Sequence, residues 1–159
     1  MIGIDTYSWT KIFLLFEDSW NEILTELLHN TQFFITKDVE IELEYFHHSY
    51  EDVWKSGAIF PRLNKNFSYY IKLGFDEADC SLLEYSELPE HTIITEDGPM
   101  LDLNVYNRNN IIQLADFFAL FFRDEYLSKN EFKLLTKWLK DNKNIKDKKF
   151  KRLVKKTIF

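Results

Sequence analysis

The chain has 159 residues, of which 45% are hydrophobic and 17% aromatic, enough apolar material to form a packed core in a single domain. Four glycines, three prolines and a single cysteine, Cys80, exclude collagen-like, linker-dominated and disulfide-stapled proteins. The N-terminal run meets a charge at Asp5, too early for a signal peptide, and no apolar stretch approaches the ~20 residues that span a bilayer. We therefore expect a soluble, cytoplasmic, globular protein with no membrane segment.

The formal net charge of -6 is unevenly distributed along the chain. Residues 133–159 hold 11 Lys or Arg and 2 Asp or Glu, a charge of about +9, which leaves about -15 on the preceding part. A basic segment on an acidic body indicates a face that binds nucleic acid or a partner, although a solvated surface helix has the same composition. The candidate nucleic-acid-binding residues are Lys146, Lys148, Lys149, Lys151, Arg152, Lys155 and Lys156.

Short apolar runs alternate with amphipathic segments along most of the chain. Residues 1–4 form an apolar run closed by Asp5, and residues 32–36 form another. Between these runs, apolar positions three and four residues apart predict a helix that begins after Asp18 or Ser19.

The second apolar run leads into a predicted helix with Val39, Leu43 and Phe46 on one buried stripe. Residues 47–66 are ambiguous, because Gly57 and Pro61 interrupt any helical pattern. Residues 66–73 have β-leaning composition but also fit a helix.

The alternation continues through the second half, with strands expected at residues 91–95 and 110–114. Helices are expected from Asp76 to about Leu88, from Gly98 to about Arg108, over residues 115–127, and twice more before the end. This order predicts a three-layer α/β/α domain with a mainly parallel central sheet over residues 1–128. Residues 129–159 are expected to form a basic, helical C-terminal extension.

Some carboxylates stand where the pattern calls for apolar residues or where a strand ends. Glu42 lies within the stripe that starts at Val39, and Asp79 shares a helix face with Leu82 and Ser86. An unpaired carboxylate facing a core costs at least a few kcal/mol, unless it is neutralised, capped or bound to a cation. Each position also has a plain structural explanation, such as a water-facing stripe edge or a favourable place near a helix N-terminus.

Asp5 and Asp97 follow predicted strands, where a turn residue or a helix cap is the plain explanation. Parallel strands end at one edge of a sheet, where α/β proteins bind ligands, so Asp5, Glu42, Asp79 and Asp97 are expected to converge. Like charges at one rim repel, and a hard divalent cation relieves that repulsion. All-oxygen ligands suit Mg²⁺ or Mn²⁺ rather than zinc.

Four segments carry a resemblance to a known family: IGIDTYSWTKI at 2–12, ITKDVEIELEYF at 35–46, GFDEADCSLLEYS at 74–86 and IITEDGPMLDL at 93–103. In order and separation they are similar to the strand-Asp-Thr opening, the Val-x-x-Glu-Leu helix, the acidic helix start and the Thr-x-Asp strand end of the PIN domain. The chain thus resembles this family of metal-dependent ribonucleases up to about residue 115. Each motif is short, so the specificity lies in the set.

The resemblance assigns the roles of metal ligand and catalytic acid to Asp5, Glu42, Asp79 and Asp97. It makes Thr6 and Thr95 supporting residues that orient these acids or metal-bound water. Glu77 is an alternative third acid, because GFDEAD also aligns with family members whose helix starts Gly-Glu-Ala-Glu; the apolar stripe favours Asp79. Glu96 and Asp102 are candidate outer-sphere groups.

The implied activity is hydrolysis of RNA phosphodiester bonds with Mg²⁺ or Mn²⁺ as cofactor. The implied partners are RNA, a homodimer mate and, for a toxin-type nuclease, a cognate antitoxin. The basic segment after about residue 130 departs from the small toxin nucleases, which leaves a role in RNA processing open. The alternative function is a catalytically inactive PIN-like module that binds RNA or protein. A haloacid-dehalogenase-type phosphohydrolase ranks lower, because Tyr7 stands where that family has a second Asp.

Other chemistry-bearing side chains are expected to be structural. The aromatic residues are mostly core, with Tyr69 and Tyr70 the better candidates for contact with a base. His47 and His48 lack partners at metal-ligand spacing, which favours a surface pair. Cys80 has no basic neighbour in the pattern and is expected to be buried.

Overall fold

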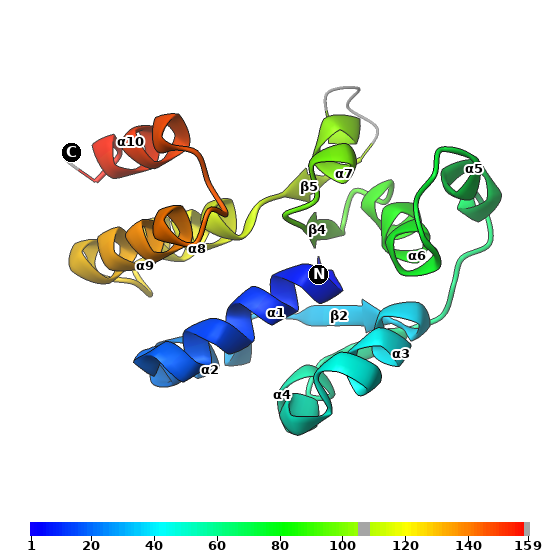
Figure 1. Ribbon diagram of the computed structural model, residues 1–159, viewed down its shortest axis with the longest axis horizontal. Helices are drawn as coiled ribbons and strands as arrows, with labels where there is room; N and C mark the ends of the chain where they lie inside the picture. The colour runs from blue at the N-terminus through cyan, green and yellow to red at the C-terminus, as the bar shows by residue number, and fades with distance from the viewer. Residues whose placement is uncertain (105–108, 158–159) are drawn as a thin grey trace. The chain divides into compact units, whose positions relative to one another are not determined.

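The computed structural model describes residues 1–104 and 109–157, and its contacts divide the chain into two units, Met1–Ile112 and Gln113–Phe159 (Figure 1). The boundary predicted from the sequence lies after residue 128. The helix that follows the last strand belongs to the second unit instead of the first. No described helix has the length and apolarity that crossing a membrane requires.

The first unit is built on a parallel sheet, which confirms the predicted α/β class with helices flanking a central sheet. Among the described residues the strands lie in the order β3-β2-β1-β4-β5. Their bounds are β1 Ile2–Ile4, β2 Phe33–Thr36, β3 Ala58–Phe60, β4 Thr92–Ile94 and β5 Ile111–Ile112. The chain runs outward from β1 through β2 to β3, and then returns to place β4 on the other side of β1. The strand order therefore reverses between β1 and β4, which is where open parallel sheets bind ligands.

The register between β1 and β4 fixes which residues emerge together from the sheet. Ile4 is paired with Ile94, and the Asp5 N–H donates to the Ile94 carbonyl oxygen over 3.2 Å. Asp5 and Thr95 therefore leave the sheet at the same level, at the carboxyl ends of adjacent strands.

Helix α1 (Thr6–Leu15) begins directly after β1 and was not predicted. A kinked segment, η1 (Phe16–Trp20), connects it to α2 (Asn21–His29). The expected helix start at Asp18 or Ser19 is instead a kink between two helices, where Ser19 has a φ of 70°. The helix predicted after Asp18 or Ser19 is nonetheless present as α2, which begins at Asn21. No element was predicted for residues 6–15, because the aromatic and β-branched residues of TYSWTKIFLL carry no clear helical signal.

The remaining helices of this unit follow the strands in turn. Helix α3 (Lys37–Phe46) follows β2, and its residues Val39 and Leu43 are fully buried as predicted. Phe46 was expected on the same buried stripe, but it is the last residue of the helix and is exposed. That expectation was wrong.

The ambiguous stretch after α3 contains a 3₁₀ turn, η2 (His48–Tyr50), the short helix α4 (Glu51–Trp54) and β3. The β-leaning segment that follows is helical, as α5 (Phe67–Lys72). Helix α6 (Glu77–Ser86) starts after the predicted cap Asp76.

Helix α7 (Gly98–Leu103) follows β4, and the expected helix end near Arg108 lies outside the described residues. The core of the unit includes large side chains that are fully buried: Trp9, Trp54, Phe34, Ile4, Leu82 and Ile94.

The second unit contains α8 (Leu114–Arg123), α9 (Lys129–Asp141) and α10 (Asp147–Lys155), all three close to the predicted positions. The rings of Phe122 and Phe132 stack with centroids 4.9 Å apart and join α8 to α9.

Candidate metal centre

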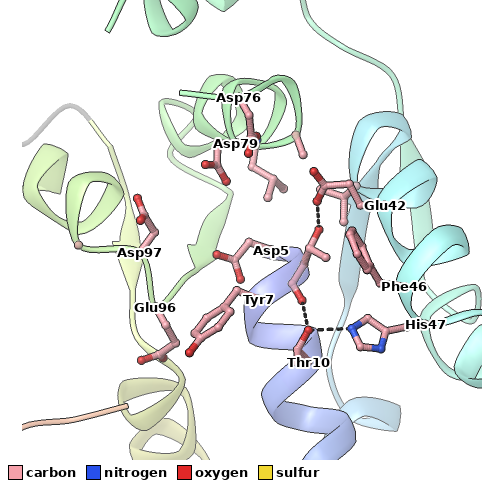
Figure 2. A pocket seen from close by; sticks show the side chains of 15 residues that line it. Asp5, Tyr7, Thr10, Glu42, Phe46, His47, Asp76, Asp79, Glu96 and Asp97 are labelled. Atoms are coloured by element: carbon pink, nitrogen blue, oxygen red, sulfur yellow. Dashed lines mark hydrogen bonds between the residues drawn. The ribbon is translucent and has the colours of Figure 1, made fainter. Parts of the chain in front are cut away.

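A cavity of about 720 Å³ opens at the carboxyl ends of β1 and β4 (Figure 2). Its walls come from α1, α3, the start of α6 and the segment that follows β4. Among the described residues no Lys or Arg lines it, whereas six carboxylates do: Asp5, Glu42, Asp76, Asp79, Glu96 and Asp97. The four acids singled out in the sequence therefore line one cavity, at the reversal point of the sheet.

Asp5 is the most buried of these carboxylates, with 4% of its surface exposed. It caps α1, because its Oδ1 accepts a hydrogen bond from the Ser8 N–H over 2.6 Å. Its Oδ2 accepts a hydrogen bond from the Thr95 hydroxyl. Burial, with a smaller contribution from the negative charge of Asp97, raises the pKa of Asp5 to about 6, against the lowering effect of these hydrogen bonds.

Glu42 projects from the middle of α3 and is partly buried. The Thr6 hydroxyl donates a hydrogen bond to its Oε2 and so fixes the carboxylate relative to α1 (Figure 2). Burial raises the pKa of Glu42, and the charges of Asp76 and Asp38 raise it further. Thr6 and Thr95 thus each hold one acid, as expected for residues that orient a metal site.

Asp79 lies in the first turn of α6, where Asp76 caps the helix by accepting the Asp79 N–H over 2.9 Å. The pKa of Asp79 is raised to about 7, first by burial and then by the negative charges of four other carboxylates, those of Asp76, Asp5, Asp97 and Glu42. Acids from four separate chain segments therefore lie within electrostatic reach of Asp79.

The alternative third acid, Glu77, points elsewhere. Its side chain is 68% exposed and pairs with Arg62 over 3.0 Å. Arg62 also holds Asp38, with Nη2 2.5 Å from Oδ1 and Nε 2.8 Å from Oδ2. Because Glu77 does not line the cavity and Asp79 does, Asp79 is the acid that the structure brings together with the others.

Asp97 closes the side of the cavity next to β4. Its Oδ2 accepts the Met100 N–H over 3.0 Å and caps α7, while its own N–H donates to Thr95 Oγ1 over 3.0 Å. Thr95 therefore connects Asp97 to Asp5 through one buried hydroxyl. Glu96 also lines the cavity, but Asp102 does not.

Asp76 and His47 line the cavity but were not among the predicted site residues. Asp76 was expected only as a helix cap, although a second acid three residues before Asp79 was visible in the sequence. His47 was expected on the surface, but it is partly buried, and its Nε2 is hydrogen-bonded to the Thr10 hydroxyl over 2.7 Å. His47 directly follows the last residue of α3 in a non-helical conformation, so helical periodicity carried no signal of its place in the cavity.

The donors in the cavity suit a hard divalent cation. Asp5, Glu42, Asp79 and Asp97 offer carboxylate oxygens, with no thiolate among the lining residues. In the part of the chain that the structure describes, no three His, Cys, Asp or Glu side chains are already clustered at metal-ligating geometry. Burial is the main cause of the raised pKa values of Asp5 and Asp79, and neighbouring negative charges raise them further, so a cation among these acids would offset both effects.

The basic residues of the second unit divide into paired and unpaired groups. Lys149 is largely buried, bonds Asp116 over 2.7 Å and donates to Gln113, so it joins α10 to α8. Lys151 pairs with Asp147 over 2.6 Å. Five other predicted cations are exposed and form no ion pair with any described residue, namely Lys146, Lys148, Arg152, Lys155 and Lys156. Of these, Lys148, Arg152 and Lys155 follow helical spacing along one face of α10.

Comparisons of the chain with protein-family models, with curated proteins and with solved structures find no match.

Proposed function

We propose that this protein is a Mg²⁺- or Mn²⁺-dependent endoribonuclease that hydrolyses RNA phosphodiester bonds in the carboxylate-lined cavity. The observation that carries the proposal is the convergence of Asp5, Glu42, Asp79 and Asp97, from four separate segments, on a cavity where the sheet reverses its order. The same residues carry the sequence resemblance to PIN-domain ribonucleases.

Asp5 and Asp97 are the best placed to hold a cation directly, because each carboxylate caps a helix. The Thr95 hydroxyl also donates to the Asp5 carboxylate and accepts the Asp97 backbone N–H. Glu42 and Asp79, on the facing helices, are the candidates to hold a second ion or to accept a proton from the attacking water. When bound, a divalent ion lowers the pKa of water and neutralises charge that develops on the phosphate. The hydrogen bond from the Thr6 hydroxyl orients the Glu42 carboxylate.

RNA must reach this acidic cavity against electrostatic repulsion, so its affinity has to come from elsewhere on the protein. The exposed face of α10 with Lys148, Arg152 and Lys155 offers positive charge not neutralised by described carboxylates. Such residues bind phosphates and release counterions, which makes the affinity salt-dependent.

The direct test is cleavage of a labelled RNA by the full chain in Mg²⁺ or Mn²⁺, with EDTA as the metal-free control. Asp5→Asn should lower the rate about 100-fold or more, the scale on which loss of one charge-stabilising group reduces catalysis. Asn still caps helices, so folding should survive, and melting curves check this. Asp52→Asn, at an exposed position outside the cavity, is the matched control and should cleave normally.

Wild-type cleavage by Asp5→Asn, or cleavage undiminished by EDTA, would contradict the enzymatic proposal. RNA binding without cleavage under any metal condition would instead favour the inactive binding module.

A further inference from the structure

Two exposed aromatic side chains share the cavity with the carboxylates. Tyr7 is 53% exposed and Phe46 is 65% exposed, and both line the cavity that contains Asp5 and Glu42. The proposed hydrolysis does not use either of them. Large exposed rings in a cavity that also contains six carboxylates call for a ligand that presents flat apolar surface as well as charge.

The two rings come from different helices and lie apart. Tyr7 is in the first turn of α1, and Figure 2 shows it on the side of Glu96. Phe46 ends α3, and the same view shows it beside Glu42 and His47, across helix α1 from Tyr7 and Asp5. The two rings therefore stand apart at one cavity, where each is available to a different nucleoside of a bound chain.

Each ring has a neighbouring side chain that would help it to bind a nucleotide. The Lys11 ammonium lies 5.2 Å from the centroid of the Tyr7 ring and forms no ion pair with a described residue, so it is available to a phosphate next to a stacked base. The Tyr45 ring meets Phe46 edge-on at 4.8 Å, which supports one edge of Phe46 while the side chain keeps its exposure.

The chemistry of the cavity limits the kinds of ligand that it can bind. An acidic peptide would be repelled by the carboxylates, and a purely apolar ligand would leave them unpaired. A chain of nucleotides supplies flat rings, and its phosphates reach the acids through divalent cations. About 720 Å³ lies within the range of cavities that hold ligands larger than an ion.

We propose that Tyr7 and Phe46 are stacking platforms for two different unpaired bases of the RNA chain that is cleaved. This inference rests on the proposed function, and it assigns substrate contacts that hydrolysis alone does not require. Stacking is tolerant of base identity, because every base has a π-face. A base held in a duplex cannot offer that face, so an annealed complementary strand should abolish these contacts.

The test uses the full chain with single-stranded RNA that carries 2-aminopurine, whose fluorescence falls when it stacks on an aromatic ring. Stopped-flow mixing in Mg²⁺ records the quenching before cleavage, and titrations give the affinity. Tyr7→Ala and Phe46→Ala should each lose quenching at one label position and weaken binding about 10-fold. Tyr7→Phe keeps the ring and should retain both signals.

Tyr126→Ala is the matched control, because Tyr126 is 50% exposed but does not line the carboxylate cavity and belongs to the second unit. If Tyr7→Ala and Phe46→Ala both cleave normally and show unchanged quenching, the stacking proposal is contradicted and the nuclease proposal is not affected. If quenching depends on Tyr7 and Phe46 but the RNA is never cleaved, the stacking sites are supported and the nuclease proposal is contradicted. Failure of wild type to bind the RNA would overturn both.

Discussion

Replacing Asp79 with Asn should stabilise the metal-free protein at pH 8, although it removes a residue of the proposed site. The pKa of Asp79 is raised from 3.8 to about 7 in the folded protein, chiefly by burial and then by its acidic neighbours. Between these two values the folded protein keeps a proton that the unfolded chain has lost. The free energy of unfolding therefore falls as pH rises through this window, and above about pH 7 the full cost of the charge is present.

The size of the effect follows from the shift. One pKa unit corresponds to about 1.4 kcal/mol, so a rise from 3.8 to about 7 sets an upper limit near 4 kcal/mol. Asp79 is only partly buried, and solvent screening reduces this to about 1–2 kcal/mol. For a chain of this length that gain raises the melting temperature by about 3–8 °C.

The assay is thermal unfolding in EDTA at pH 8 and pH 5. Asp79→Asn should melt higher than wild type at pH 8, and the difference should shrink at pH 5, where folded Asp79 is largely protonated. Glu77→Gln is the matched control on the same helix and should show no gain, because Glu77 pairs with Arg62 outside the cavity. A destabilised Asp79→Asn protein, or an equal gain in melting temperature at both pH values, would refute the claim that the charge of Asp79 destabilises the folded protein.

Three further outcomes follow from the structure. Thr95→Val removes the hydroxyl that connects Asp5 to Asp97, so cleavage should fall about 10-fold in kinetic assays, and an unchanged rate would count against this positioning role. Glu84→Gln should lower the free energy of unfolding in urea by about 1–3 kcal/mol, because this buried carboxylate accepts the N–H groups of residues 64–66; a neutral result would contradict this. Joint replacement of Lys148 and Arg152 by Ala should make the salt dependence of RNA affinity shallower by roughly 1.4 logarithmic units per decade, and an unchanged slope would remove α10 from the interface.

The strand ends were predictable because their signals are local. Asp5 follows a short apolar run, Asp97 follows another with one residue between, and parallel strands share an edge. The pairing of Ile4 with Ile94, which places Thr95 beside Asp5, is a long-range register that no local pattern specifies.

The helical part of the site was harder to predict. Each residue along a helix turns the side chain by about 100°, so the two residues from Glu77 to Asp79 turn it by about 200°. This separates Asp79 in the cavity from Glu77 on Arg62. Stripe periodicity therefore favoured the acid that lines the cavity. It failed for Phe46, because α3 ends at that residue and the final turn faces the cavity mouth instead of the core.

The missed elements are those in which tertiary packing overrides local preference. Helix α1 was missed and α5 was left open between strand and helix, because both are rich in aromatic and β-branched residues, which favour strands when isolated. Trp9 in α1 and Tyr70 in α5 are nonetheless almost fully buried, and their packing stabilises the helices. Strand β3 has only three residues, too few for an alternating pattern to be read.

The most direct test of the whole account is calorimetric titration of the metal-free protein with Mn²⁺, because every functional proposal requires the carboxylates to share a cation. Wild type should bind Mn²⁺ saturably, and Asp97→Asn should bind at least about 10-fold more weakly while α7 keeps its cap. Asp52→Asn, outside the cavity, should match wild type. Equal Mn²⁺ affinity in wild type and Asp97→Asn, or no saturable binding by wild type, would contradict the claim that these acids form a metal centre.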